Sequence, residues 1–238
     1  PAQIPQVGVV TIQPQAFTLT SELPGRTTAY RIAEVRPQVN GIILKRLFKE
    51  GGDVKEGQQL YQIDPSVYDA TLKSAQASLT QTKSISDRYK QLVDEQAVSR
   101  QEYDTAVANR MTAEANLQTA QINVRYTKVF APISGRIGRS SVTEGALVSN
   151  GQTDAMAVIQ QLDPIYVDVT QSSAEMLKLR RDLESGQLQK SGENAAMVKL
   201  TLEDGSEYAQ QGKLEFSEVS VDQTTGSVTL RAVFPNPD

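Results

Sequence analysis

The chain has 238 residues, of which 39% are hydrophobic and 22% charged, a composition that allows one large domain or two to three small ones. Its net charge of -4, without a long basic run, argues against nucleic acid as a partner. Because the chain contains neither Cys nor His, thiol nucleophiles, Cys/His zinc sites, histidine acid–base catalysis and disulfides are excluded.

The first 64 residues have the patterns of β-strands. Residues 7–20 alternate apolar and polar side chains, and Pro24-Gly25-Arg26 predicts a turn. Between residues 33 and 64, short apolar runs are separated by glycine turns, which predicts several short strands.

A long helical segment follows, because no Gly or Pro occurs between Pro65 and Pro132. Apolar and small residues recur there at steps of three and four, which is typical of two packed helices. The positions are Tyr68, Leu72, Ala75, Leu79, Thr82, Ser86, Tyr89 and Val93, then Tyr103, Ala106, Arg110, Ala113, Leu117, Ala120 and Val124. The spacing predicts antiparallel helices over 66–93 and 100–126, each ~40 Å long, joined by a tip at about 94–99.

Two polar details are expected in this hairpin. Arg110 falls opposite Ser86 and Asp87, so it either pairs with Asp87 in a polar layer or extends its charge to water. Ser99 and Glu102 have the S-x-x-E spacing of a capping box at the start of the second helix.

The strands before the hairpin have counterparts after it. Seven positions match at a constant offset of 94 residues: Val39, Gly41, Ile43, Glu50, Gly51, Val54 and Gly57 match Ile133, Gly135, Ile137, Glu144, Gly145, Val148 and Gly151. A single copy has too few strands for a stable sheet. We therefore predict that the two halves pair into one small β-sandwich, from which the hairpin emerges.

The rest of the chain predicts a β-barrel. Strands are expected at 165–169, 197–202, 212–216 and 227–234, with a hairpin turn at 203–206. Between the first two strands, residues 172–175 favour the cap of a short helix that runs to Gly186. Its predicted apolar side consists of Met176, Leu177, Leu179 and Leu183. We expect the N-terminal strands to complete the barrel.

Split half-motifs that flank a helical hairpin and precede a barrel resemble the periplasmic adaptor, or membrane fusion, proteins of RND tripartite multidrug efflux pumps. The stretches that carry the likeness are 25–27, 31–64, 126–151, 161–172 and 221–238. The resemblance implies an elongated, multidomain α+β fold: a split lipoyl-like β-sandwich with a long antiparallel α-helical hairpin, plus a β-barrel domain.

The implied domains have the following boundaries. The barrel consists of N-terminal strands in 1–29 and the segment 164–238. The lipoyl-like domain consists of a first half at 30–64 and a second half at 128–163, and the coiled-coil hairpin lies between them at 65–127. The family's membrane-proximal domain is expected to be missing, and both ends of the sequence are expected to be boundaries within a longer protein.

The resemblance also implies a function without catalysis, cofactor or metal. Family members reside in the periplasm, attached to the inner membrane by a lipid on the full-length protein. They join an inner-membrane RND transporter to a TolC/OprM-type outer-membrane channel and form a ring, expected to be hexameric. The family's tip motif, R-x3-L-x6-S, falls on Arg88, Leu92 and Ser99, which are therefore expected to contact the channel.

Other interpretations stay open. A lipoyl or biotinyl group carrier shares the β-unit, but it needs a modifiable lysine at the junction that the hairpin occupies here. An adaptor of an ABC or MFS export system is a further alternative. An enzyme would have to rely on carboxylates scattered near turns, with no histidine to activate a hydroxyl. At the tip, Arg88 pairing with a carboxylate of its own helix and Leu92 packing internally would be the structural alternatives.

Overall fold

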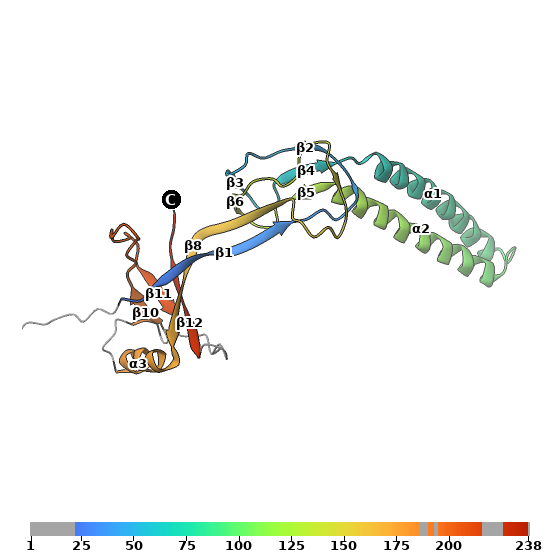
Figure 1. Cartoon of the computed structure of the whole chain (residues 1–238). Helices are drawn as coiled ribbons and strands as arrows, with labels where there is room; N and C mark the ends of the chain where they lie inside the picture. The colour runs from blue at the N-terminus through green and yellow to red at the C-terminus, as the bar shows by residue number, and fades with distance from the viewer. Residues whose placement is uncertain (1–21, 186–189, 193–194, 216–225, 238) are drawn as a thin grey trace, which may run out of the picture.

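The computed structural model describes residues 22–185, 190–192, 195–215 and 226–237. The described chain is elongated, with a helical hairpin at one end, a β-sandwich next to it and the barrel domain at the other end (Figure 1). The predicted fold class is confirmed. The expected strand at 7–20 lies entirely outside the described residues.

The hairpin consists of α1 (Ser66–Asp94) and α2 (Arg100–Tyr126), within one residue of the predicted limits. Its contact stripe is also as predicted, because every position of the stripe is buried or half-buried. Ala106, Ala113 and Ala120 are the buried positions of α2, and they recur every seven residues, which is about two helical turns. Small side chains at this spacing let the two helices lie close along their length.

Arg110 does not have the partner that the sequence suggested. Its Nε atom lies 3.5 Å from Oε1 of Glu114, one turn further along α2, rather than pairing with Asp87. The same Nε is buried and has no hydrogen-bond partner among the described residues. Ser86, on the facing helix, is 2% exposed. The middle of the hairpin is therefore polar, but its charge is balanced along α2 instead of across the two helices.

The sandwich interleaves the two half-motifs, as the repeat predicted. The first half supplies β2 (Gly41–Arg46), β3 (Asp53–Val54) and β4 (Gln59–Ile63), and the second supplies β5 (Lys128–Phe130), β6 (Gly135–Ile137) and β7 (Leu147–Val148). Strand β2 pairs with β7 and β3 pairs with β6, so each repeat is completed by the other. One sheet has the order β5-β4-β2-β7. The fully buried side chains between the strands include Ile43, Leu60, Tyr61, Ile63, Ile137, Met156 and Ile159.

Hydrogen bonds repeat with the same pseudo-twofold relation. The N–H of Gly51 donates to the Ile137 carbonyl at 2.9 Å, and the N–H of Gly145 donates to the Ile43 carbonyl at 2.8 Å. Gly51 and Gly145 have φ values of 70° and 86°, which side-chain-bearing residues rarely adopt. The matched glycines therefore mark equivalent turns of the two halves.

Two long strands connect the sandwich with the barrel. β1 (Gly25–Val35) pairs along its length with β8 (Ala157–Ser172), with a register shift between Ala29 and Arg31. Because Gly25 and Arg26 are the first residues of β1, the turn predicted at 24–26 is wrong. Both strands run through the expected boundaries at 29/30 and 163/164, so the division into domains stays a prediction.

The barrel domain adds β9 (Lys190–Gly192), β10 (Ala195–Val198), β11 (Gly212–Glu215) and β12 (Ser227–Phe234) to β8, in the order β8-β12-β11-β10-β9. The described core comprises Val167, Val169, Leu214, Val228, Leu230, Ala232 and Phe234. β10 ends four residues before the predicted limit of 202, and the turn predicted at 203–206 is present, with the Gly205 N–H bonded to the Leu202 carbonyl at 2.9 Å.

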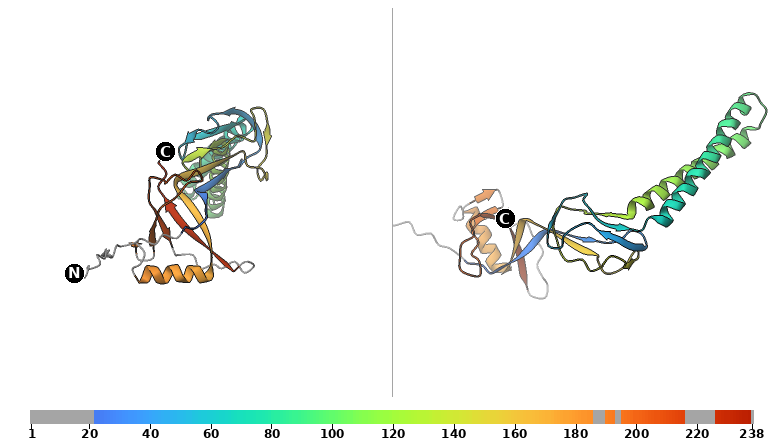
Figure 2. Two further views of the ribbon diagram at one scale, coloured as in Figure 1. Left: turned by 60° about the vertical axis from the view of Figure 1, so that its left-hand side comes forward. Right: turned by 90° about the horizontal axis from the view of Figure 1, so that it is seen from above.

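The predicted short helix is α3 (Ser173–Glu184), which lies beside the barrel strands (Figure 2). Met176 and Leu179 pack on the barrel core as expected. Leu177 does not, because it is 51% exposed, and the side chain of Leu183 lies outside the described part. In the described ranges, no helix has the length and apolarity needed to cross a bilayer.

Candidate interaction site at the hairpin tip

The tip is the part of the hairpin most distant from the β-domains, as the right-hand view in Figure 2 shows. α1 ends at Asp94, and the chain reverses through Gln96, whose φ of 56° is left-handed. The N–H of Ala97 donates to the carbonyl of Leu92 at 2.8 Å, which closes the turn. The tip is thus a compact, hydrogen-bonded loop rather than a loose connection.

Arg88 and Leu92 lie one helical turn apart on α1, so they share a face. The Arg88 side chain is exposed and forms no hydrogen bond or ion pair with any residue that the structure describes. Leu92 is half-buried, so part of its side chain packs inside the hairpin and part faces outward. The intrahelical ion pair considered for Arg88 is therefore not formed within the described chain.

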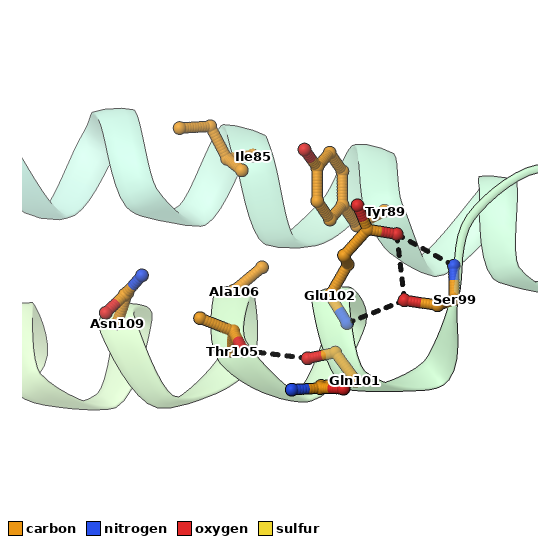
Figure 3. Close-up of a pocket in the computed structure, with 8 residues that line it drawn as sticks. All are labelled: Ile85, Tyr89, Ser99, Gln101, Glu102, Thr105, Ala106 and Asn109. Atoms are coloured by element: carbon orange, nitrogen blue, oxygen red, sulfur yellow. Dashed lines mark hydrogen bonds between the residues drawn. The ribbon is translucent and has the colours of Figure 1, made fainter.

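Ser99 caps α2, as the sequence predicted. Its Oγ accepts a hydrogen bond from the Glu102 N–H at 3.2 Å and donates to Glu102 Oε2 at 2.8 Å, while the Ser99 N–H donates to the same carboxylate oxygen at 2.9 Å (Figure 3). Two hydrogen bonds from Ser99 lower the pKa of Glu102; the bond from the backbone N–H has the larger effect and the bond from the side chain the smaller. Any contact that Ser99 makes with another protein must therefore be compatible with this cap.

An open hollow of about 530 Å³ lies between the two helices beside the tip. Ile85 and Tyr89 line it from α1, and Thr105 and Asn109 line it from α2, together with the N-cap residue Ser99 (Figure 3). Thr105 donates its hydroxyl to the Gln101 carbonyl at 2.7 Å, so that its polar group is already satisfied. The sequence prediction named Ser99 and Glu102 as a capping box and placed Tyr89 and Ala106 in the contact stripe, but it did not predict a hollow here.

The three residues of the spacing motif thus come from one end of the hairpin and offer different contacts. Arg88 supplies an unpaired cation, Leu92 an apolar surface and Ser99 a hydroxyl already committed to a helix cap. These features suit binding to a protein surface, where cations and apolar side chains act together. Across the described ranges, no group of three or more acidic residues is arranged to hold a metal ion.

Two family models match the chain. The model of the barrel-sandwich hybrid domain of RND membrane fusion proteins matches residues 31–160, and the model of the β-barrel domain of the same proteins matches residues 164–238. The first match alone extends over more than half of the chain.

Curated proteins match over the entire chain. It is 80% identical to the probable efflux pump periplasmic linker TtgA of Pseudomonas putida and 67% identical to the multidrug resistance protein MexA of Pseudomonas aeruginosa. In both alignments the chain is covered completely but spans only 62% of the relative's length.

Solved structures have the same fold. A MacA–MexA chimera that contains the MexA α-hairpin domain of Pseudomonas aeruginosa superposes with a TM-score of 0.70 at 30% identity, covering 90% of this chain and 74% of the chimera. A putative efflux transporter from Bacteroides eggerthii has a TM-score of 0.69 at 21% identity, over 90% of this chain and 61% of its own.

Proposed function

The chain belongs to the family of RND membrane fusion proteins, and from this premise we propose that it is the central part of a periplasmic adaptor in a drug efflux pump. In this proposal the adaptor links an inner-membrane RND transporter to a TolC/OprM-type outer-membrane channel and has a structural and coupling role without catalysis. Copies of it form a ring, proposed to be hexameric, and the full-length protein is held at the inner membrane by a lipid.

The observation that carries the proposal is the long hairpin projecting from a β-base. Helices of 29 and 27 residues span roughly 40 Å, enough to place the tip far from the barrel. The names of similar proteins support the same function, because TtgA is described as an efflux pump periplasmic linker and MexA as a multidrug resistance protein.

The hairpin tip is proposed as the channel-binding site. In this proposal, Arg88 donates hydrogen bonds to acceptors on the channel and Leu92 adds apolar contact. Ser99 stabilises the first turn of α2 as its cap and also contacts the channel. A groove between channel helices is a suitable acceptor for such a hairpin, because helical side chains at positions i and i+4 fill one groove together. The exposure of Arg88 and its lack of an ion partner among the described residues support this assignment.

The test is in cells that carry the complete pump, with the full-length protein. Arg88→Asp is expected to abolish both drug efflux and cross-linking of the tip to the channel, because it reverses the charge offered to the groove. Lys73→Asp is the matched control, since it makes the same charge change at an exposed site about 20 Å away on α1. If Arg88→Asp retains efflux and cross-linking, the tip assignment is wrong.

Ser99 needs variants that separate capping from docking. Ser99→Thr retains the hydroxyl and the cap but adds a methyl group to the surface, whereas Ser99→Ala removes the cap at a cost of about 1 kcal/mol. A docking role predicts that Ser99→Thr reduces efflux while the helicity and the unfolding midpoint stay unchanged. Full efflux with Ser99→Thr and reduced efflux with Ser99→Ala would restrict Ser99 to capping.

An adaptor for an ABC or MFS exporter is the second candidate, because the fold alone does not select the transporter. The family models favour the RND class, since both domains match RND membrane fusion proteins. Cross-linking from cysteines placed on the barrel, with the captured transporter identified by mass, distinguishes the two classes.

A further inference from the structure

The hairpin meets the sandwich at two places, where β4 leads into α1 and where α2 leads into β5 (Figure 1). Each helix has a tyrosine there. Tyr68, in the first turn of α1, and Tyr126, the last residue of α2, are both half-buried, and both pack against the core of the sandwich. The two rings thus seat the two helices on the same base.

The two tyrosines differ in the contacts of their hydroxyl groups. The hydroxyl of Tyr68 donates a hydrogen bond to the backbone carbonyl of Asn40 at 2.7 Å. The hydroxyl of Tyr126 has no hydrogen-bond partner among the described residues. Within the described ranges, the bond from Tyr68 is the only hydrogen bond that joins either helix to a sandwich residue distant in the sequence. This contact on the α1 side is therefore in a position to set the direction of the hairpin.

Asn40 is itself bound to the second half of the sandwich. It directly precedes β2, and its Oδ1 atom accepts a hydrogen bond at 2.7 Å from the N–H of Asn150, which lies in the turn after β7. Hydrogen bonds thus run from Asn150 through Asn40 to Tyr68, and we call these three residues the base strut. The strut connects α1 to both half-motifs, because Asn40 belongs to the first and Asn150 to the second.

The 94-residue repeat provides an internal comparison for the strut. The positions equivalent to Asn40 and Asn150 are Ser134 and Glu56, and they form the same bond, because the Glu56 N–H donates to Ser134 Oγ at 2.9 Å. In the part of the chain that the structure describes, no side chain donates to the carbonyl of Ser134. The bond between the two turns is therefore common to both halves, whereas the additional bond from a helix is specific to Asn40.

The length of the hairpin makes the position of its tip sensitive to its base. With helices ~40 Å long, a tilt of about 10° moves the tip by roughly 7 Å. A hydrogen bond is lost once its donor and acceptor are more than about 3.5 Å apart. A small loss of rigidity at the base is therefore enough to misplace contacts at the tip, although both helices stay folded.

We propose that Tyr68 is the positioning residue of the hairpin. Its ring seats α1 on the sandwich, and its hydroxyl, held through Asn40, fixes the angle at which the hairpin projects. Tyr68 acts through the placement of the tip and contacts no partner protein itself. The consequence for the pump rests on the proposed function, whereas the angle is a property of the chain alone.

The angle is measured with spin labels on two engineered cysteines, for which the chain is suited because it contains none. Lys83→Cys on α1 lies ~25 Å from the start of the helix, and Lys49→Cys lies on the sandwich, both at exposed sites. Pulsed electron paramagnetic resonance gives the distribution of distances between the labels. Tyr68→Phe retains the ring and loses the hydroxyl, so the population of displaced hairpins is expected to rise by roughly fivefold, the factor for one ordinary hydrogen bond.

Two controls separate the strut from general stability. Tyr126→Phe removes a hydroxyl that has no partner in the described chain, so it is expected to leave the distance distribution unchanged. Ser134→Ala breaks the equivalent bond of the other half, so it is expected to lower the unfolding midpoint about as Tyr68→Phe does, but without broadening the distribution. A wild-type distribution in Tyr68→Phe, or equal broadening in all three variants, would overturn the proposal.

Asn40→Ala tests the second bond of the strut. It removes the acceptor for the Asn150 N–H, so that the Asn40 carbonyl is held less firmly, and it is expected to broaden the distribution. Asn40→Ser transfers the residue of the equivalent position and is expected to retain a narrow distribution. Broadening by Tyr68→Phe but not by Asn40→Ala would remove Asn150 from the strut.

The full-length protein in cells with the complete pump separates this inference from the proposed function. Tyr68→Phe is expected to reduce both efflux and cross-linking of the tip to the channel, and Tyr126→Phe to retain both. Full efflux and cross-linking with Tyr68→Phe would overturn its positioning role, while the adaptor function would stand. If the wild-type tip gives no cross-link, the channel assignment fails, and a broadened distribution in Tyr68→Phe still supports the strut.

Discussion

The carboxylate of Glu144 accepts a hydrogen bond from the backbone N–H of Arg46 at 2.9 Å, which ties the second half of the sandwich to the first. The equivalent carboxylate, that of Glu50, accepts from the N–H of Ser140 at 3.0 Å. The two donors, Arg46 and Ser140, are 94 residues apart, and so are the two acceptors, Glu50 and Glu144. The repeated glutamates are therefore reciprocal clasps between the halves, and this explains why both copies of the motif contain one.

The first prediction concerns this clasp. Glu144→Ala leaves the Arg46 N–H without its partner and is expected to lower the free energy of unfolding by about 1 kcal/mol. Glu144→Gln retains an acceptor oxygen and should have a much smaller effect. Urea unfolding followed by circular dichroism measures both variants. Equal losses for the two would mean that the charge of Glu144, not its hydrogen bond, stabilises the sandwich.

The second prediction concerns Gly135 and Gly51, two glycines that both belong to the repeated half-motifs of the sandwich. A Cβ at Gly135 would lie 2.4 Å from the carbonyl oxygen of Gln160, because β6 packs closely against β8 there. A Cβ at Gly51 would meet nothing within 4 Å, although its φ is 70°. We expect Gly135→Ala to cost about 3 kcal/mol through overlap in addition to the strain of its φ of 156°, and Gly51→Ala about 1 kcal/mol through backbone strain alone.

Thermal unfolding of the two alanine variants side by side checks the order. The comparison is informative because both substitutions add the same methyl group. A larger loss for Gly51→Ala would show that backbone conformation, rather than the close approach of β6 and β8, controls the stability of this region.

The sequence predicted the architecture because its signals were local or repeated. The absence of Gly and Pro from 66 to 131 and the three-four spacing determined both helices within one residue at each end. The repeated Glu-Gly turns predicted that the two halves share a sandwich. The capping box at Ser99 was visible because its partner is only three residues away. Each of these features depends on near neighbours or on an internal copy.

The errors concerned contacts that depend on distant geometry. Arg110 was placed opposite Asp87 by helical spacing, but its own-helix neighbour Glu114 competes successfully because it is one turn away. The turn predicted at 24–26 is part of β1, because β8 supplies a pairing partner that overrides the local preference of Pro24-Gly25 for a turn. The hollow beside the tip was missed, since it depends on how side chains of two helices are arranged in space and not on any motif.

The third prediction is a pH dependence at the tip. Hydrogen bonds from Ser99 hold the pKa of Glu102 below its ordinary value, so the folded state favours the ionised form. The cap's contribution is therefore complete above the ordinary pKa of about 4.3 and is lost as the pH falls through the lowered folded value. Glu102→Gln removes this titration while retaining an acceptor.

Circular dichroism of the chain between about pH 5 and pH 2 measures the effect, in the range where the carboxyl titrates. The stability of the wild-type chain should fall more steeply than that of Glu102→Gln over this interval, because the variant lacks the titrating group. Identical profiles would mean that the cap does not depend on the charge of Glu102.

The fourth prediction concerns the polar centre of the hairpin. Arg110 Nε is buried without a hydrogen bond, and the nearest charge, on Glu114, is at 3.5 Å. Arg110→Met removes the unsatisfied donor and continues the contact stripe, so it is expected to raise the free energy of unfolding by about 1 kcal/mol. Glu114→Gln should lower it by less than about 0.5 kcal/mol, since the Glu114 side chain is exposed and pairs within one helix, and Asp87→Asn should leave it unchanged.

The three variants together identify the partner of Arg110. Each is unfolded with a chemical denaturant, and the loss of helix is followed by circular dichroism at 222 nm. A loss for Asp87→Asn that disappears in the Arg110→Met background would show a coupling between the two helices, as the sequence suggested. A loss for Glu114→Gln that disappears in the same background supports the pairing along α2.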